Sequence, residues 1–120
     1  MNLKLSKPLV VFDLETTGLV IGQAHIVEMS MIKVNPDGSE QEWTFRLNPT
    51  VHIPEETTAI HGISDEDVKD CPTFAELARK IAAFIGNADL CGYNSNKFDV
   101  PLLVEEFLRT DVEFSLHNRR

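Results

Sequence analysis

Residues 8–15 read Pro-Leu-Val-Val-Phe-Asp-Leu-Glu, an apolar run of strand-forming side chains that ends in acids. Valine and phenylalanine favour the pleated surface of a sheet. A short run that is apolar at most positions is typical of a strand with neighbours on both sides. The run therefore predicts a sheet in which residues 8–15 form a buried central strand.

Two further strands are expected at about residues 24–34 and 40–47. Between them, Asn35-Pro-Asp-Gly38 is a strong turn signal, because proline presets one backbone dihedral and glycine accepts positive φ. Two strands joined by so short a turn must be antiparallel, so the first half is predicted to be a three-strand meander. Alternation along the first of these strands places one set of side chains on a common side: Ile26, Glu28, Ser30 and Ile32.

The second half of the chain carries helix signals. Ser64 and Thr73 each begin a capping-box pattern, in which a hydroxyl is followed three residues later by an acid. The second pattern opens the clearest helix, which Gly86 is expected to end. Its apolar residues recur at helical spacing on one face: Phe74, Leu77, Ala78, Ile81 and Ile85.

A short strand at residues 88–93 and an amphipathic helix at 96–109 complete the predicted elements. Pro101 is acceptable in that helix because it lies near the first turn. The resulting fold class is α/β, with an antiparallel three-strand meander followed by helix–strand–helix. Such an order of elements is the beginning of a ribonuclease H-like fold.

Length and charge narrow the classes of function. The chain has 120 residues and is expected to be a single domain, 1–120, because it is too short for two independent cores. Its net charge of −8, from 11 basic and 19 acidic residues, argues against a protein that coats duplex nucleic acid with a basic face. The charge is compatible with an enzyme that grips one strand end through divalent metal ions.

Two observations bear on the cellular compartment. No apolar stretch approaches the roughly 20 residues needed to span a bilayer, and the first residues lack a secretory signal core. We therefore expect a cytoplasmic protein with no membrane contact. Cys71 and Cys91 fit neither a disulfide framework nor a zinc pattern, so the expectation is two buried thiols.

The acids at the end of the first strand, Asp13 and Glu15, are two residues apart. Side chains alternate across a strand, so both are predicted to point to the same face, with Cα atoms about 7 Å apart. Neighbouring like charges are costly unless a positive charge compensates them, and hard oxygen ligands of this kind suit Mg²⁺ or Mn²⁺. The alternative is that the strand ends there and both acids reach solvent.

A third acid, Asp99, is expected in the first turn of the last helix. The helix dipole favours negative charge at that position, so stabilisation of the helix alone is an alternative to metal binding. Taken singly, each acid leaves both interpretations open.

Three stretches together carry a family resemblance. Phe12-Asp-Leu-Glu-Thr-Thr-Gly18 resembles the first signature of the DEDD superfamily of 3′–5′ exonucleases, which includes the proofreading epsilon subunit of bacterial replicative DNA polymerase. Asn94-Ser-Asn-Lys-Phe-Asp99 is similar to the second signature, and Ile60-His-Gly-Ile-Ser64 is similar to a stretch typical of the epsilon-like branch. The three stretches occur in the expected order over most of the chain.

The resemblance implies a two-metal phosphodiesterase that removes nucleotides from the 3′ end of single-stranded nucleic acid. Asp13, Glu15 and Asp99 would hold two Mg²⁺ or Mn²⁺ ions, with Asp13 bridging them. The positions at which the family contacts the terminal nucleotide are those of Thr16, Thr17, Gly18, His61, Ile63 and Asn94. The resemblance favours DNA over RNA and a role in proofreading or repair. It leaves three settings open: a polymerase subunit with a DNA polymerase catalytic subunit as partner, a free exonuclease, or part of a larger chain.

One signature of the family is absent from this sequence. The resemblance implies a late histidine followed five residues on by an aspartate, which supply the general base and the fourth carboxylate. No such pair follows Asp99, and His117 is the only later histidine. We therefore expect that the C-terminal part of the fold is missing, that the chain self-associates or is less stable than an extended form, and that it is not fully active alone.

Two other classes of function stay open. The missing signature favours a non-catalytic module that binds a strand end or a partner protein. The stretch from Asp13 to Thr16 also resembles the strand end of phosphotransferases that use an aspartate nucleophile. The meander argues against this second class, because those enzymes continue into a parallel α/β sheet.

Overall fold

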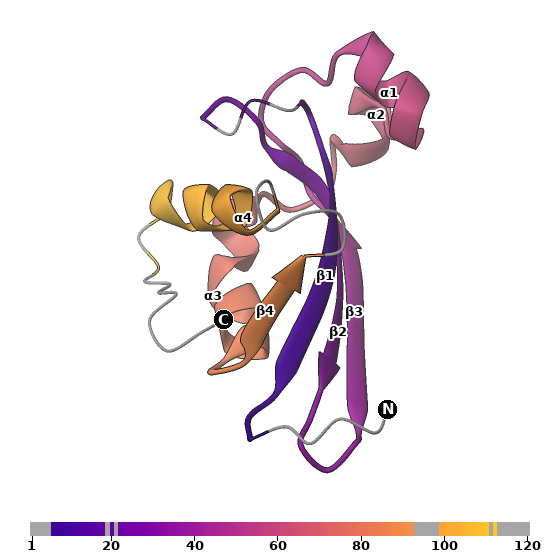
Figure 1. Cartoon of the computed structure of the whole chain (residues 1–120). Coiled ribbons are helices and arrows are strands. Elements are labelled where there is room, and N and C mark those ends of the chain that lie inside the picture. Colours follow the sequence, from indigo (N-terminus) through magenta and orange to yellow (C-terminus); the bar gives the residue numbers. More distant parts are fainter. Residues whose placement is uncertain (1–5, 19, 21, 93–98, 111, 113–120) are drawn as a thin grey trace.

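The computed structural model describes residues 6–18, 20, 22–92, 99–110 and 112. Within them, the elements in chain order are β1 (Leu9–Thr16), β2 (Ile26–Val34), β3 (Glu40–Arg46), α1 (Glu55–His61), α2 (Asp65–Val68), α3 (Phe74–Ile85), β4 (Asp89–Gly92) and α4 (Asp99–Leu108). The strands form a sheet in the order β3-β2-β1-β4, and α3 and α4 cover one of its faces (Figure 1). This arrangement confirms the predicted α/β fold.

β1 is an interior strand of the sheet, as predicted, because it pairs antiparallel with β2 and parallel with β4. Its side chains alternate between the two faces. Val10, Phe12 and Leu14 are buried in the main core with α3 and α4, whereas Asp13 and Glu15 are half-buried on the opposite face. Within the described part of the chain, β1 is therefore fully covered on one face only.

Two antiparallel pairs confirm the predicted meander of β1, β2 and β3. In the turn between β2 and β3, the N–H of Gly38 donates to the carbonyl oxygen of Asn35 at 2.9 Å. Gly38 has a φ of 90°, a conformation that side chains disfavour, which explains the glycine at that place.

One residue interrupts the regular pairing of β1 with β2. Glu15 of β1 lies opposite Glu28 of β2, and the next residue of β1 lies opposite Ile26. Val27 is therefore an extra residue, a β-bulge. The bulge directs Ile26 into the main core and Val27 into a second apolar cluster with Ile53, Ile63 and Val68. The prediction that Ile26 shares a side with Glu28 is wrong for this reason.

Both predicted capping boxes are present. At the start of α2, Ser64 Oγ accepts from the N–H of Asp67, and Asp67 Oδ2 accepts from the N–H of Ser64. Thr73 and Glu76 exchange the same pair of hydrogen bonds at the start of α3, which ends before Gly86 as predicted. These bonds satisfy backbone donors that a helix start leaves without partners.

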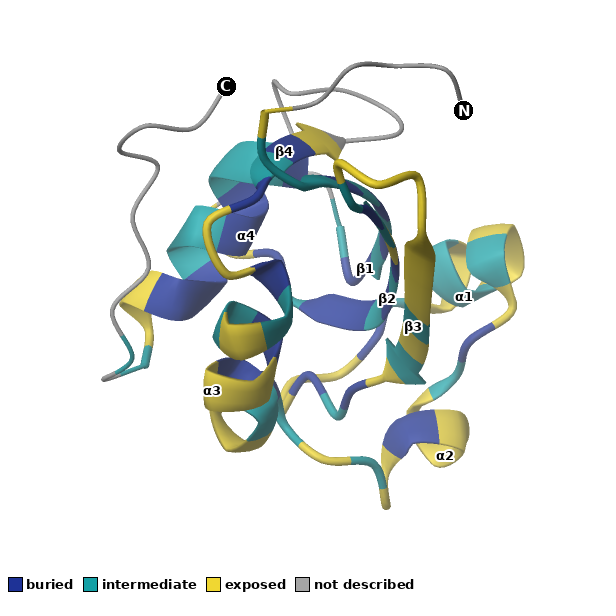
Figure 2. Ribbon diagram, turned by 90° about the horizontal axis from the view of Figure 1, so that it is seen from below, coloured by how far each residue is buried: buried dark blue, intermediate teal, exposed yellow. Residues whose placement is uncertain are grey.

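The main core lies between the sheet and the helices α3 and α4. Figure 2 shows buried residues gathered between these layers, whereas β3 is largely exposed. α4 buries Leu102, Leu103 and Phe107 as predicted, while residues 96–98 of the predicted helix lie outside the described residues. In the part of the chain that the structure describes, every helix is too short or too polar to cross a lipid bilayer.

α1 is an element that the sequence pattern did not predict. It follows Pro54 and ends at Gly62, whose φ of 80° and N–H bond to the carbonyl of Thr58 at 2.7 Å form a left-handed cap. None of its residues is buried, so it has no apolar stripe that could signal a helix. The predicted helix–strand–helix section is thus preceded by α1 and by the short α2.

The prediction of two buried thiols is wrong. Cys71 is half-buried, Cys91 is exposed, and neither forms a disulfide. Leu90 takes the core-facing position of β4, so Cys91 faces away from the main core, opposite Val11.

Candidate active site

Asp13 and Glu15 lie on the same face of β1, as predicted from their spacing. They alternate with Phe12 and Leu14, which fill the main core. The Oδ1 atom of Asp13 is buried and accepts no hydrogen bond within the described part of the chain. A carboxylate oxygen is costly to bury without a donor. This atom is therefore placed where a cation would offset its charge.

Asp99 lies in the first turn of α4, as predicted, and it is 1% exposed. β4 runs parallel to β1, and its last residue lies opposite Phe12, one residue before Asp13. The parallel pairing of β4 with β1 therefore ends one residue before Asp13. The next element of the chain is α4, which begins with Asp99.

Burial and neighbouring negative charges together raise the pKa of Glu15. Burial is the largest cause that raises its pKa above the ordinary value of 4.5; the charges of Asp13, Glu28 and Asp99 raise it as well, while His61 lowers it. Asp13 and Asp99 therefore both act electrostatically on Glu15, and Glu28 of β2, which was not predicted, does so as well.

Glu15→Gln is expected to raise the free energy of unfolding of the metal-free chain at neutral pH by up to about 1 kcal/mol. Because folding raises the pKa of Glu15, the ionised carboxylate disfavours folding. This penalty is absent below the ordinary pKa of 4.5 and develops as the pH rises through the folded value. Urea unfolding at neutral pH and near pH 4 measures the gain, which should vanish in acid. A loss of stability at neutral pH would show that the fold already compensates this charge.

His61, the last residue of α1, is hydrogen-bonded to the end of β1. Its Nδ1 accepts from the N–H of Ile63, and its Nε2 lies 3.1 Å from the carbonyl oxygen of Thr16. The neutral tautomer with its proton on Nε2 satisfies both bonds. The imidazole thus fastens α1 next to Glu15, and both of its nitrogens are engaged.

The threonines that follow the acids of β1 have buried side chains with internal partners. Thr16 Oγ1 donates to the carbonyl of Gly18 at 2.7 Å, and Thr17 Oγ1 accepts from the N–H of His25 at 3.0 Å. Ile63 is buried in the second apolar cluster. A nucleotide at this place would therefore meet the backbone of these residues rather than their side chains.

The residues predicted to contact a terminal nucleotide gather where β1 ends, as far as they are described. His61 connects Thr16 to Ile63 through hydrogen bonds. The other described members of the set, Thr17 and Gly18, directly follow Thr16 at the end of β1. Asn94 lies outside the described residues. A contact between this set and a nucleotide stays a prediction.

The acids fit a divalent cation in chemical type. Carboxylate oxygens are the ligands that Mg²⁺ and Mn²⁺ prefer, and one of them, Asp13 Oδ1, is buried without a donor. In the described ranges, however, no three Asp, Glu, His or Cys side chains converge as a metal-binding group. The site therefore offers the charge and the donor type for a cation, without a closed cage of ligands.

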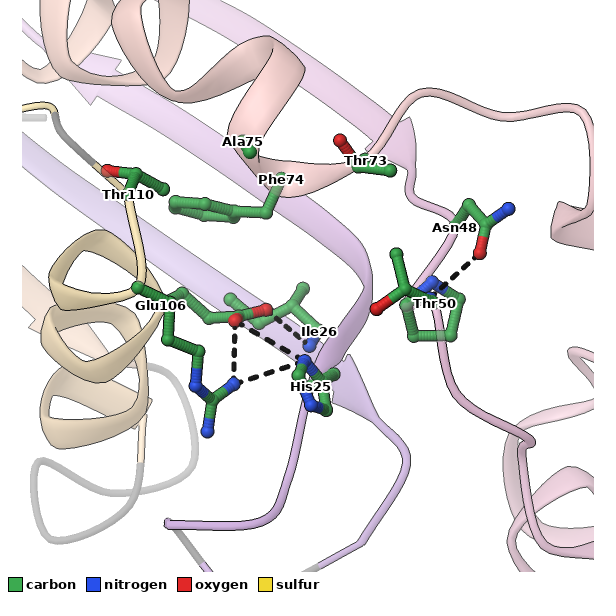
Figure 3. A pocket seen from close by; sticks show the side chains of 11 residues that line it. His25, Ile26, Asn48, Thr50, Thr73, Phe74, Ala75, Glu106 and Thr110 are labelled. Carbon is green, nitrogen blue, oxygen red and sulfur yellow. Dashed lines mark hydrogen bonds and ion pairs between the residues drawn. The ribbon is translucent and has the colours of Figure 1, made fainter.

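A second charged cluster was missed from the sequence. It lines a cavity of about 200 Å³ between β2, α3 and the end of α4 (Figure 3). Glu106, 3% exposed, accepts there from the N–H of Ile26 at 3.0 Å and from Nη1 of Arg109 at 2.8 Å, with His25 Nδ1 at 3.6 Å. Glu106 follows Leu103 by three residues, a spacing that could have placed it on the buried face. Because these groups bond one another, we interpret the cluster as an anchor for α4.

Comparison with known proteins assigns the family. The chain matches the Exonuclease (RNase_T) family over residues 10–118, and that family normally uses divalent metal ions. The DNA polymerase III subunit epsilon of Rickettsia prowazekii is 37% identical over 110 residues, which are 88% of this chain and 48% of that protein. The epsilon subunit of Escherichia coli K12 is 34% identical over 116 residues, 92% of this chain and 44% of that protein.

A PolC-type DNA polymerase III from Oceanobacillus iheyensis is 32% identical over 104 residues, which are 87% of this chain but only 7% of the relative. The chain thus spans about half the length of the epsilon subunits or less. Among solved structures, exonuclease I (apo) superposes with a TM-score of 0.76 at 18% identity, over 88% of this chain and 25% of that one. This likeness supports the ribonuclease H-like fold. Because the family match extends over residues 10–118, the chain belongs to the Exonuclease family, as its motifs predicted.

Proposed function

We propose that the chain acts as a divalent-metal-dependent 3′–5′ exonuclease on single-stranded DNA, in proofreading or repair, beside a DNA polymerase catalytic subunit. The observation that carries the proposal is the Oδ1 atom of Asp13, which is buried without a donor among the described residues of a chain of the Exonuclease family. DNA as substrate is supported by relatives named DNA polymerase III subunit epsilon and DNA polymerase III PolC-type, and by a similar structure, that of Escherichia coli exonuclease I in complex with a dT13 oligonucleotide.

In this proposal Asp13, Glu15 and Asp99 would hold the two Mg²⁺ or Mn²⁺ ions. When bound, such ions activate a water molecule and stabilise the charge that develops on the phosphate and the leaving oxygen. The chain contributes a partly dry setting, since Asp99 is 1% exposed and its attraction for a cation is stronger there than in water. His61 and Gly18, both half-buried, would position the terminal nucleotide.

His61 is poorly suited to act as the general base. Its Nδ1 already accepts the N–H of Ile63, so a proton taken at Nδ1 would break that bond. The family resemblance implies a histidine–aspartate pair for this step, and no such pair follows Asp99 in this sequence. General acid–base catalysis contributes about 10²–10⁴-fold, so a site that relied on His61 for this step would turn over more slowly, by about that factor, than a site with a free histidine.

With Mn²⁺, the chain is expected to shorten a 5′-labelled single-stranded DNA oligonucleotide slowly and stepwise from its 3′ end, releasing 5′-mononucleotides. A time course on a denaturing gel measures this. A 3′-phosphate should block the reaction, and Asp13→Asn should abolish the Mn²⁺-dependent part of it. Cleavage of a closed circular single strand would contradict an exonuclease and indicate an endonuclease.

A second candidate is a module that binds a 3′ end without cleaving it, and the engagement of both ring nitrogens of His61 in hydrogen bonds supports it. The same oligonucleotide distinguishes the two. A Mn²⁺-dependent change in fluorescence anisotropy that requires a free 3′ hydroxyl, with no nucleotide released over many hours, would favour the binding module.

A further inference from the structure

A row of charged residues crosses three strands on the face of the sheet that α3 and α4 leave uncovered. Glu15 of β1 lies opposite Glu28 of β2, and Glu28 lies opposite Arg46 of β3. Residues directly opposite in antiparallel strands share a face, with Cβ atoms about 4.5–5.5 Å apart. Across the sheet the order of charges is therefore negative, negative, positive.

The ion pair in this row holds the middle carboxylate. Arg46 Nε donates to Glu28 Oε1 at 3.3 Å, and the side chains are 46% and 30% exposed. Like charges directly opposite one another destabilise a sheet, so the contact between Glu15 and Glu28 has a cost that the ion pair offsets only in part.

The neighbouring row on the same face does not place two acids opposite each other. It runs from Asp13 through Ser30 to Thr44. There the two hydroxyls bond each other at 2.6 Å, and the residues of β2 and β3 in the row of Asp13 carry no charge. The sheet thus accommodates an uncharged residue, Ser30, opposite the acid Asp13. Pairing within the sheet therefore does not by itself explain why a second acid lies opposite Glu15.

The bulge fixes where Glu28 points. Regular pairing of β1 with β2 ends at the pair of Glu15 and Glu28, because Val27, which precedes Glu28 in β2, is the extra residue of the bulge. A slip of one residue would turn Glu28 towards the core. Val27 packs with Ile53 and Ile63, which ties the bulge to the segments before and after α1.

We propose that Glu28 is a positioning residue of the carboxylate site: held by Arg46, it adds a fourth negative charge beside Glu15 and so strengthens the binding of a divalent cation by Asp13, Glu15 and Asp99. This inference rests on the proposed function. The Coulomb interaction of a unit charge with a divalent ion several ångströms away, in a dielectric close to that of water, changes a binding constant about tenfold.

Titration calorimetry with Mn²⁺ alone, on the 120-residue chain, tests the inference. Glu28→Gln is expected to weaken Mn²⁺ binding about tenfold. The matched control is Glu40→Gln, which makes the same change of charge at the other end of β3, opposite Val34. Six residues along a strand span about 20 Å, which exceeds the Debye length of about 10 Å at 0.1 M salt. The control should therefore bind Mn²⁺ within about twofold of the parent.

A charge swap separates positioning from a merely structural role. Glu28→Arg with Arg46→Glu keeps an ion pair between β2 and β3 but places the positive charge beside Glu15. If the charge of Glu28 acts on the cation, the swap weakens Mn²⁺ binding more than Glu28→Gln does. If the pair only holds the strands together, the swap restores binding to the level of the parent. Thermal melts on both variants verify that they fold.

The outcomes separate this inference from the proposed function. A parent chain that binds no Mn²⁺, or that binds it as well after Asp13→Ala, would overturn both. A parent that binds Mn²⁺ at Asp13 while Glu28→Gln binds equally well, or while the swap restores affinity, would overturn the role of Glu28 alone.

Discussion

Asp13→Ala is expected to lower the affinity of the chain for Mn²⁺ by at least about a hundredfold. Residues that only support a metal ligand already change affinity about 10–100-fold, and Asp13 is proposed as a direct ligand. Its Oδ1 is buried and accepts no hydrogen bond from the described residues, so it has no competing role in the fold. Titration calorimetry of mutant and parent measures the difference.

Two variants control this experiment. Asp13→Asn keeps the shape of the side chain and removes its charge, so it should lose nearly as much affinity as the alanine variant. Glu40→Ala removes an exposed carboxylate at the far end of β3, about 20 Å along the strand from Arg46, and should change Mn²⁺ binding less than about twofold because salt screens that charge. Equal affinities for parent and Asp13→Ala would mean that the acids of β1 are only a strand end that reaches solvent.

The parts of the fold with local signals were predicted closely from the sequence. α3 begins after Thr73 and ends before Gly86, because both limits are set by side chains and backbone within a few residues. The turn from Asn35 to Gly38 likewise fixes how β2 pairs with β3. Counting outward from that turn places Glu28 opposite Arg46, so this ion pair could have been predicted.

The pairing of β1 with β2 could not be predicted in the same way. The connection between them is not a tight turn, and the register also changes at Val27. The bulge depends on two separate apolar clusters, one containing Ile26 and the other Val27, to which distant segments contribute. The partnership of Glu15 with Glu28 is thus a property of the tertiary structure.

α1 illustrates the same limit. Its attachment is polar: Thr57 Oγ1 donates to the carbonyl of Thr17 at 3.3 Å, and His61 bonds the carbonyl of Thr16. These partners are far from α1 in sequence, and no periodic apolar pattern announces them. Of the site, the shared face of Asp13 and Glu15 followed from strand alternation. The place of Asp99 depended on the family resemblance, because the pairing of β4 with β1 is long-range.

Glu106→Leu is expected to lower the free energy of unfolding by about 3–5 kcal/mol, because it removes one partner from a buried charged pair. Leucine leaves the N–H of Ile26 and the guanidinium of Arg109 without the carboxylate that accepts from both. Since domains of this kind are stable by only about 5–15 kcal/mol, the loss is a large fraction of the total. Urea unfolding followed by circular dichroism measures it.

Glu105→Gln provides a matched control for this prediction. Glu105 also pairs with Arg109, but at 4.0 Å and with a side chain 36% exposed, so the expected loss is below about 1 kcal/mol. α4 begins at Asp99, and Glu106 fastens the same helix to β2 two turns later. The leucine variant should therefore also bind Mn²⁺ more weakly than Glu105→Gln at temperatures where both are folded. If Glu106→Leu proves as stable as the parent, apolar packing by Leu102, Leu103 and Phe107 alone holds α4, and the charged cluster needs a different explanation.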